Sequence, residues 1–237
     1  MTGRPVATFA YFSSTCFIIS PHERNRSANF EHVPQNMVKP SLIQVADPMC
    51  SWCYAFEPEL HRVGEATGLD IRLVMGGLFV DDRAVALDDQ MRSYLDETWQ
   101  RVGNMSGQPI NFDLIKWPKW TYDTGPSCRA VVAMRTTAPE HAFDYFEAIQ
   151  RAFYADNLDV TKTEVLIDLA ESMGFGSEEF AKLATQPDLA DEDYAEARAL
   201  GANGFPTLIL DTGTTRTPVS TGYSKADRII RSIEVMS

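Results

Sequence analysis

The residues best suited to chemistry in this chain are Cys50 and Cys53, which are separated by Ser51 and Trp52. If a helix begins at Cys50, this spacing places both sulfur atoms on one face, at a Cα separation of about 4.4–6.8 Å that suits a disulfide. The start of a helix presents unpaired backbone amides and the positive end of the helix dipole, which favour the thiolate form of a cysteine. Cys53, one turn further in, is expected to be less exposed and is suited to resolving a mixed disulfide.

A cysteine pair at this spacing has three chemical interpretations. A zinc site needs four ligands, and Cys128 and His61 would have to be recruited from afar because no second Cys-x-x-Cys or histidine pair occurs. Two buried structural thiols are the second interpretation. A redox pair is the third, and it is favoured because the pair follows a predicted strand and opens a predicted helix. We therefore expect a redox-active pair and no metal.

The residues around the cysteines predict a strand, a helix and a second strand. Residues 41–46 form a short apolar run typical of a buried strand, and residues 47–49 form a turn. A helical pattern then continues to about Thr67, with Gly68 as a stop signal. Residues 70–75 alternate as a strand does, so the unit is predicted to be a right-handed parallel crossover.

Between about residues 82 and 201 the apolar residues recur at helical spacing, which predicts a block of helices. Thr161 with Glu164 matches a capping box at the start of one helix, and Ser177 is predicted to cap another. A buried helical core explains the aromatic stripes of this block more simply than a ligand groove does.

After the helical block the pattern returns to strands. Residues 207–211 are β-branched and apolar, and residues 216–220 are predicted to pair with them as a hairpin. Ser224 is predicted to cap a final helix. The first of these strands is preceded by Phe205 and Pro206, and a proline at a strand start is tolerated because its missing amide removes no ladder bond.

These motifs together resemble the thioredoxin superfamily. The long helical stretch before the proline resembles the DsbA family within it, especially the FrnE-like predicted disulfide isomerases of bacteria. The resemblance covers about residues 40–235. It rests on three motifs, which are Asp47-Pro48-Met49-Cys50-Ser51-Trp52-Cys53-Tyr54, Pro58 five residues after the second cysteine, and Gly204-Phe205-Pro206-Thr207 before a strand.

The resemblance implies an α/β, thioredoxin-like fold with a large all-helical insertion between the second strand and the cis-proline loop. It implies that Cys50 is the attacking cysteine, that Cys53 resolves, that Pro206 is cis, and that the backbone of Phe205 pairs with an extended substrate. Trp52 joins Phe205 and Pro206 as a predicted substrate contact. The Ser-Trp dipeptide between the cysteines is neither the Pro-His of a strong oxidant nor the Gly-Pro of a reductant, so the redox direction stays open.

The predicted organisation has three parts. Residues 40–80 and 202–235 form the thioredoxin-like domain, residues 81–201 form the helical insertion, and residues 1–36 form an extension that is loosely ordered. This extension holds Cys16 and is interpreted as an added or misplaced start, which favours a cytoplasmic protein. The alternative is a secretory signal and an exported protein.

Three further side chains near the cysteines are candidates for supporting roles. Asp47, three residues before Cys50, is expected to cap the helix, and the alternative is a proton relay to the resolving thiol. Glu57 and His61 lie further along the same helix, where a solvated face is the default interpretation and tuning of the resolving thiol is the alternative. Cys128 lies on an apolar helical stripe and is expected to be a core residue.

Composition limits the classes of function. The chain has 21 Lys+Arg against 33 Asp+Glu, a net charge of −12, which argues against nucleic-acid binding. No apolar run approaches a membrane span. We therefore expect a thiol:disulfide oxidoreductase or isomerase acting on cysteine-containing proteins or peptides, without a cofactor, or with glutathione as redox partner. The alternatives are a glutathione-dependent enzyme of the kappa-class transferase or hydroxychromene-carboxylate isomerase type, and a non-catalytic binding module.

Overall fold

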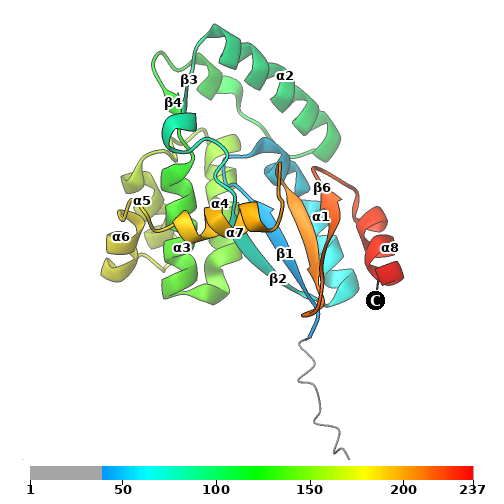
Figure 1. The fold of residues 1–237 in the computed structure, drawn as a ribbon. Helices are drawn as coiled ribbons and strands as arrows, with labels where there is room; N and C mark the ends of the chain where they lie inside the picture. The colour runs from blue at the N-terminus through cyan, green and yellow to red at the C-terminus, as the bar shows by residue number, and fades with distance from the viewer. Residues whose placement is uncertain (1–38, 237) are drawn as a thin grey trace, which may run out of the picture. The chain divides into compact units, whose positions relative to one another are not determined.

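The computed structural model describes residues 39–236. Its central sheet has four strands in the order β2-β1-β5-β6 (Figure 1). β1 pairs with β2 in parallel, whereas β5 is antiparallel to both β1 and β6. The predicted parallel pairing of β1 with β2 and the predicted hairpin of β5 and β6 are therefore confirmed. The strands are β1 (Ser41–Ala46), β2 (Asp70–Met75), β5 (Thr207–Asp211) and β6 (Arg216–Thr221).

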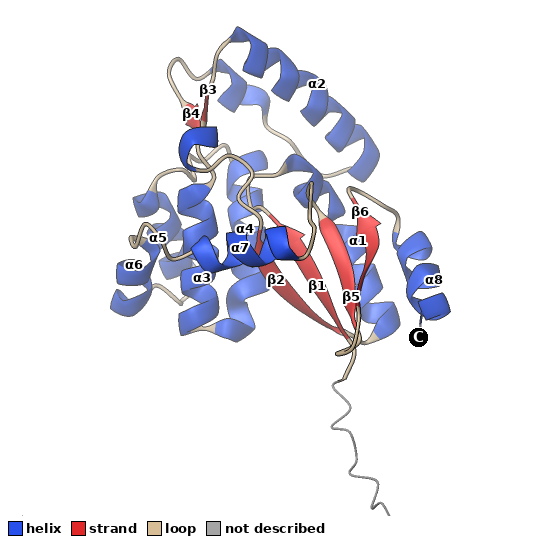
Figure 2. Ribbon diagram, in the orientation of Figure 1, coloured by secondary structure: helices blue, strands red, loops and turns tan. Residues whose placement is uncertain are grey.

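Helices cover both faces of this sheet, with α7 in front and α1 behind in the view of Figure 2. Neighbouring residues of β1 face different helices. Leu42 packs with α1 (Ser51–Thr67) and α8 (Ala226–Met236) on one face of the sheet. Ile43 packs with α7 (Asp191–Ala199) on the other face. Successive side chains of a strand point to opposite faces, so a strand buried on both sides is mostly apolar; in β1 the buried Gln44 is the exception.

The stretch between β2 and β5 is mostly helical, as predicted, but it also contains a small antiparallel sheet. The expectation of an all-helical insertion is wrong at this point, because two strands of two residues each are too short to leave a period in the sequence. The helices are α2 (Asp89–Ser106), α3 (Gly125–Thr137), α4 (Ala142–Tyr154), α5 (Thr163–Ser172) and α6 (Glu178–Ala184), and the strands are β3 (Val85–Ala86) and β4 (Thr121–Tyr122).

Helix starts were predicted with mixed success. The Ser177 side chain accepts a hydrogen bond from the amide of Phe180, as expected for a cap. The capping box at Thr161 is wrong, because α5 begins only at Thr163 and the Thr161 hydroxyl donates to Asp159 instead.

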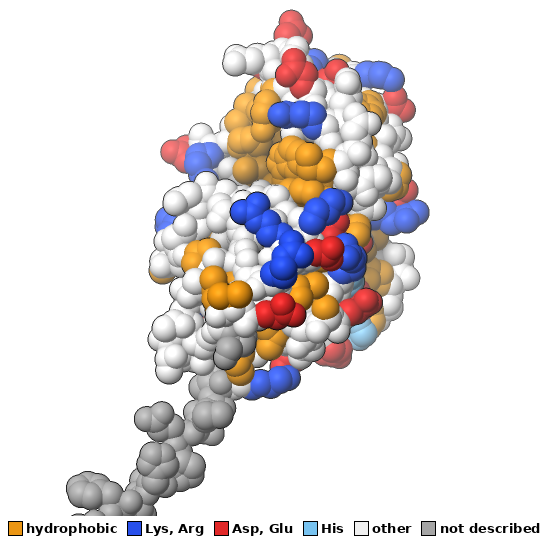
Figure 3. Space-filling view, turned by 90° about the vertical axis from the view of Figure 1, so that its right-hand side faces the viewer, with side chains coloured by type: hydrophobic (Ala, Val, Ile, Leu, Met, Phe, Trp, Pro, Cys, Tyr) orange, Lys and Arg blue, Asp and Glu red, His pale blue; other side chains and the backbone are white. Residues whose placement is uncertain are grey.

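The last helix is capped from a distance. The amide of Ala226 at the start of α8 donates to the buried carboxylate of Glu59 on α1, so Glu59 takes the role predicted for Ser224. Arg62 and Lys225 also bind Glu59. The face that carries α8 accordingly shows basic and acidic side chains intermingled (Figure 3).

No helix within residues 39–236 is long and apolar enough to span a bilayer. The predictions made for residues 1–36, including Cys16 and the secretory signal, lie outside the described residues.

Candidate active site

The sheet brings the predicted site residues together at one edge. Ala46 at the end of β1 lies beside Met75 at the end of β2, and Val45 lies beside Thr207 at the start of β5. The chain segments that follow β1 and β2 and precede β5 therefore meet there. They carry the cysteine pair, Gly76 and the Phe205–Pro206 loop.

Cys50 occupies the N-cap position of α1. Its carbonyl accepts hydrogen bonds from the amides of Cys53 and Tyr54, while its own backbone is still extended. Cys50 is 5% exposed and Cys53 1%, so the first sulfur has the better access to a partner. This order agrees with the sequence-based expectation.

The thiols of Cys50 and Cys53 are both free. Burial, followed by the hydrogen bond and the charge of Cys50, raises the pKa of the Cys53 thiol well above its usual value. Cys53 therefore holds its proton in the folded dithiol form, and the two sulfurs are chemically unequal.

The loop at Pro206 faces the cysteine pair. The Phe205–Pro206 peptide bond is cis, as the family resemblance implied. The Cys50 thiol donates to the carbonyl oxygen of Phe205 across a sulfur-to-oxygen distance of 3.7 Å. On the other side of the loop, the Pro206 carbonyl accepts from the amide of Gly222.

Asp47 lies beneath the site and is completely buried. Its carboxylate accepts from the amides of Met49 and Leu78, neither of which belongs to α1, so the predicted helix-capping role is wrong. The thiol of Cys128 donates to the same carboxylate at 3.4 Å. Burial raises the pKa of Asp47, although the hydrogen bond from Leu78 opposes this shift.

Two tyrosines from the helical region complete the site, and sequence reasoning missed them. The hydroxyls of Tyr122 and Tyr154 both donate to the carbonyl of Met49, the residue before Cys50. All of these groups are buried. The sequence spacing of these tyrosines does not indicate that they share a partner. They come together only in the folded protein, because Tyr122 lies on β4 and Tyr154 on α4.

Comparisons with known proteins agree with this geometry. The model of the DSBA-like thioredoxin domain family matches residues 42–229. The chain belongs to the DSBA-like thioredoxin domain family. A candidate protein disulfide isomerase from Nitrosomonas europaea shares its fold with a TM-score of 0.75 and 30% identity, over 84% of this chain and 97% of that one.

Two further relatives are informative. The cytosolic disulfide reductase DsbM from Pseudomonas aeruginosa has a TM-score of 0.66 and 27% identity, over 83% of this chain and 98% of its own. The ClpXP adapter protein SpxH of Halalkalibacterium halodurans is 26% identical over 139 residues. That match covers 56% of this chain but 45% of SpxH, so the chain spans a little under half the length of this curated relative.

Glycine is required at one position of the DSBA-like site. A Cβ atom on Gly76 would lie 2.0 Å from the Phe205 ring, which rests on the bare backbone there. Gly76→Ala is expected to displace the ring and the loop, to lower stability by about 1–3 kcal/mol and to slow disulfide exchange. Gly204→Ala is the matched control, since a Cβ at Gly204 meets nothing within 4 Å. Equal exchange rates in the two variants would contradict this role of Gly76.

Glu57 and His61 point away from the thiols and toward α4. The His61 imidazole lies 2.8 Å from the Glu147 carboxylate, and Glu57 accepts from the side chain of Gln108. Possible ligand atoms of Glu57, His61 and Glu147 all lie within 4.8 Å of one another. Because the His61–Glu147 contact already engages two of the three, we interpret the cluster as a polar contact between α1 and α4. Tuning of Cys53 by Glu57 or His61 stays a prediction.

Burial and the neighbouring Glu147 raise the pKa of Glu57 to about 7. A carboxyl whose pKa is raised on folding stabilises the fold below its unfolded pKa of about 4.5 and loses that contribution as the pH rises to about 7. Glu57→Gln is therefore expected to add about 1–2 kcal/mol of stability at pH 8, allowing for solvent screening, and nothing at pH 5. Urea unfolding at both pH values checks this, with the exposed Glu65→Gln on the same helix as control. An equal gain at both pH values would refute the assignment.

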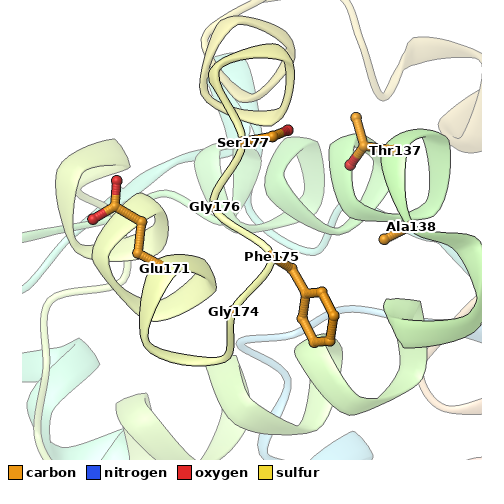
Figure 4. Close-up of a pocket in the computed structure, with 7 residues that line it drawn as sticks. All are labelled: Thr137, Ala138, Glu171, Gly174, Phe175, Gly176 and Ser177. Atoms are coloured by element: carbon orange, nitrogen blue, oxygen red, sulfur yellow. The ribbon is translucent and has the colours of Figure 1, made fainter.

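A cavity of about 430 Å³ lies far along the helical region, between the ends of α3, α5 and α6 (Figure 4). Phe175 and Glu171 line it, and in Figure 4 the Glu171 carboxylate points away from the phenyl ring. The lining contains neither cysteine nor histidine, so this cavity offers no thiol chemistry.

Proposed function

We propose that this DSBA-like protein exchanges disulfides with protein or peptide thiols through Cys50 and Cys53. The observation that supports this most is the position of Cys50, whose sulfur lies at the start of α1 and 3.7 Å from the carbonyl of Phe205. That carbonyl precedes the cis-proline and faces the same space as the sulfur. In this proposal Trp52 and the Phe205–Pro206 backbone contact the substrate, as the family resemblance implies.

The reaction from the dithiol form has two steps. The Cys50 thiolate attacks a substrate disulfide, an S–S bond to Cys50 forms, and one substrate sulfur leaves as a thiolate and takes up a proton. Cys53 then loses its proton and attacks the Cys50 sulfur, which releases the second substrate thiol. Two electrons pass to the substrate, and the protein is left with a Cys50–Cys53 disulfide. The same steps in reverse oxidise a substrate dithiol.

The raised pKa of Cys53 is consistent with Cys50 attacking first and Cys53 second. A resolving thiol that holds its proton does not compete with Cys50 for the incoming disulfide. Covalent attachment of the Cys50 sulfur removes its negative charge, which is one of the causes of the raised pKa of Cys53 besides burial, so that pKa falls at the step where Cys53 must react. Asp47, whose charge also raises the pKa of Cys53, is a candidate acceptor for the proton.

Glutathione is the proposed redox partner. The relative DsbM is described as a cytosolic disulfide reductase and has been solved with GSH at 27% identity to this chain. Two glutathione molecules would reduce the Cys50–Cys53 disulfide and leave as glutathione disulfide. We also propose a cytoplasmic location, because the relative DsbM is described as cytosolic. Fractionation of cells that express the full chain tests this location.

The direct test is turnover by the purified full chain. We expect glutathione-coupled reduction of insulin, reactivation of a scrambled disulfide protein, and a Cys50–Cys53 disulfide in the oxidised product by mass spectrometry. Absence of that disulfide after oxidation in a glutathione buffer would refute the mechanism. Glutathione-dependent turnover of a small molecule that survives loss of Cys53 would favour the transferase or isomerase alternative.

A second candidate function is partner binding without catalysis. The match to SpxH favours it, because that relative is described as an adapter protein. This candidate predicts a protein partner that binds equally well when Cys50 and Cys53 are both replaced by serine. Pull-down with the double variant, beside the exchange assay, separates the two functions.

A further inference from the structure

A cavity of about 520 Å³ is lined by Gly204 and Phe205, the residues that precede Pro206. Gly204 and Phe205 form one wall, and Gly76 and Leu78 after β2 form another. Phe205, which lines the cavity, is also the residue whose carbonyl accepts from the Cys50 thiol at 3.7 Å, so the cavity and the reacting sulfur share a neighbour. Its volume falls in the range of about 300–1,000 Å³ that is usual for small-molecule and peptide-sized ligands.

Two arginines, Arg83 and Arg198, line this cavity, and both are exposed. Neither makes an ion pair or a side-chain hydrogen bond with any residue in the range 39–236. Other arginines of the chain do find carboxylates, as Arg72 does with Glu196 and Arg135 does with Asp193. These two guanidinium groups are distinguished by their place, because both line one cavity beside the Phe205 loop.

The acidic residues nearest in sequence do not neutralise the pair. Asp81 and Asp82 precede Arg83 but do not line the cavity. Glu196, two residues before Arg198, is held by two hydrogen bonds from Arg72 on β2. The positive charge of the cavity is therefore available to a ligand. A guanidinium binds a carboxylate through two parallel hydrogen bonds, which fixes geometry as well as charge.

We propose that Arg83 and Arg198 bind carboxylates of the substrate beside the exchanged cysteine. The protein then selects acidic disulfide substrates, which include acidic peptides and the carboxylates of glutathione. This inference rests on the proposed exchange reaction and names its substrate class. A peptide that runs along the Phe205 backbone advances about 3.3 Å per residue, so a carboxylate one or two residues from the cysteine reaches the cavity.

The test compares two matched peptide disulfides, one with aspartate and one with asparagine at the positions flanking the cysteine. We expect the wild-type kcat/KM to favour the aspartate peptide by about tenfold at low salt, and less as salt screens the contact. In Arg83→Gln with Arg198→Gln the ratio is expected to fall to about one, mainly through KM. Arg231→Gln, exposed in the middle of α8 and outside this cavity, is the control and should keep the wild-type ratio. Equal kcat/KM for both peptides in the wild-type protein, or a preference that survives the double replacement, would overturn the proposal.

A binding measurement separates this inference from the exchange reaction itself. S-methylglutathione carries both carboxylates of glutathione but no free thiol, so it cannot exchange. We expect calorimetry to detect its binding to the wild-type chain and a loss of affinity of about tenfold in the double variant. Binding of S-methylglutathione without any turnover of peptide disulfides would support the carboxylate site and contradict the exchange function. Turnover of both peptides at equal rates, together with no binding of S-methylglutathione, would contradict the carboxylate site and support the exchange function.

Discussion

Replacing Cys50 with serine is expected to lower the rate of disulfide exchange by about a thousandfold or more, because a serine hydroxyl is not ionised at neutral pH and cannot form the mixed disulfide. Cys53→Ser is expected to behave differently. It leaves the attacking sulfur in place and removes only the resolving step, so a covalent adduct with the substrate should accumulate at Cys50. Non-reducing electrophoresis and mass spectrometry of each variant, after incubation with a peptide disulfide, measure both outcomes.

Cys128 supplies the matched control for these two variants. It is a third buried free thiol, and its sulfur lies 3.4 Å from the Asp47 carboxylate. Cys128→Ser keeps a donor for that carboxylate, so exchange is expected to continue and no adduct to form. Burial raises the pKa of Cys128 and its position beneath the site denies it contact with a substrate. An adduct on Cys128, or a trapped adduct in Cys50→Ser, would overturn the assignment of roles.

The framework of the fold could be predicted because it is encoded locally. The apolar run of β1, the alternation of β2 and the β-branched β5 each lie in a window of five or six residues. Gly68 ends α1 in the left-handed conformation that glycine adopts without strain, at the position the sequence indicated. The cis bond at Pro206 was a different case, since only the family resemblance implied it.

Contacts between distant segments could not be predicted. Asp47 had the spacing of a helix cap, yet its buried carboxylate accepts from the amide of Leu78, 31 residues later in the chain. Glu59 likewise caps α8 from 167 residues away. Arg83 and Arg198 are unremarkable in the sequence and share a cavity only because α7 returns to the sheet beside β2. Each failure concerns a polar group whose partner is set by tertiary packing.

The two tyrosines that bind the Met49 carbonyl should act as a unit. Either hydroxyl alone still satisfies that buried carbonyl, so Tyr122→Phe or Tyr154→Phe is expected to cost only about 1 kcal/mol. The phenylalanine rings keep the aromatic contacts, such as the stacking of Tyr154 on Tyr54 with ring centres 4.9 Å apart. With both hydroxyls removed the carbonyl has lost both donors, and the cost should rise to about 3–4 kcal/mol.

This excess over additivity is what distinguishes a shared contact from two independent ones. Urea unfolding of the wild-type chain, both single variants and the double variant measures it as a double-mutant cycle. The Met49 carbonyl adjoins Cys50, so the double variant is also expected to resolve mixed disulfides more slowly than either single variant. Tyr145→Phe is the control, because that buried hydroxyl donates to Leu166 in the helical region instead. Strictly additive losses, or an equal effect of Tyr145→Phe on exchange, would show that the tyrosines stabilise the fold without positioning the cysteine.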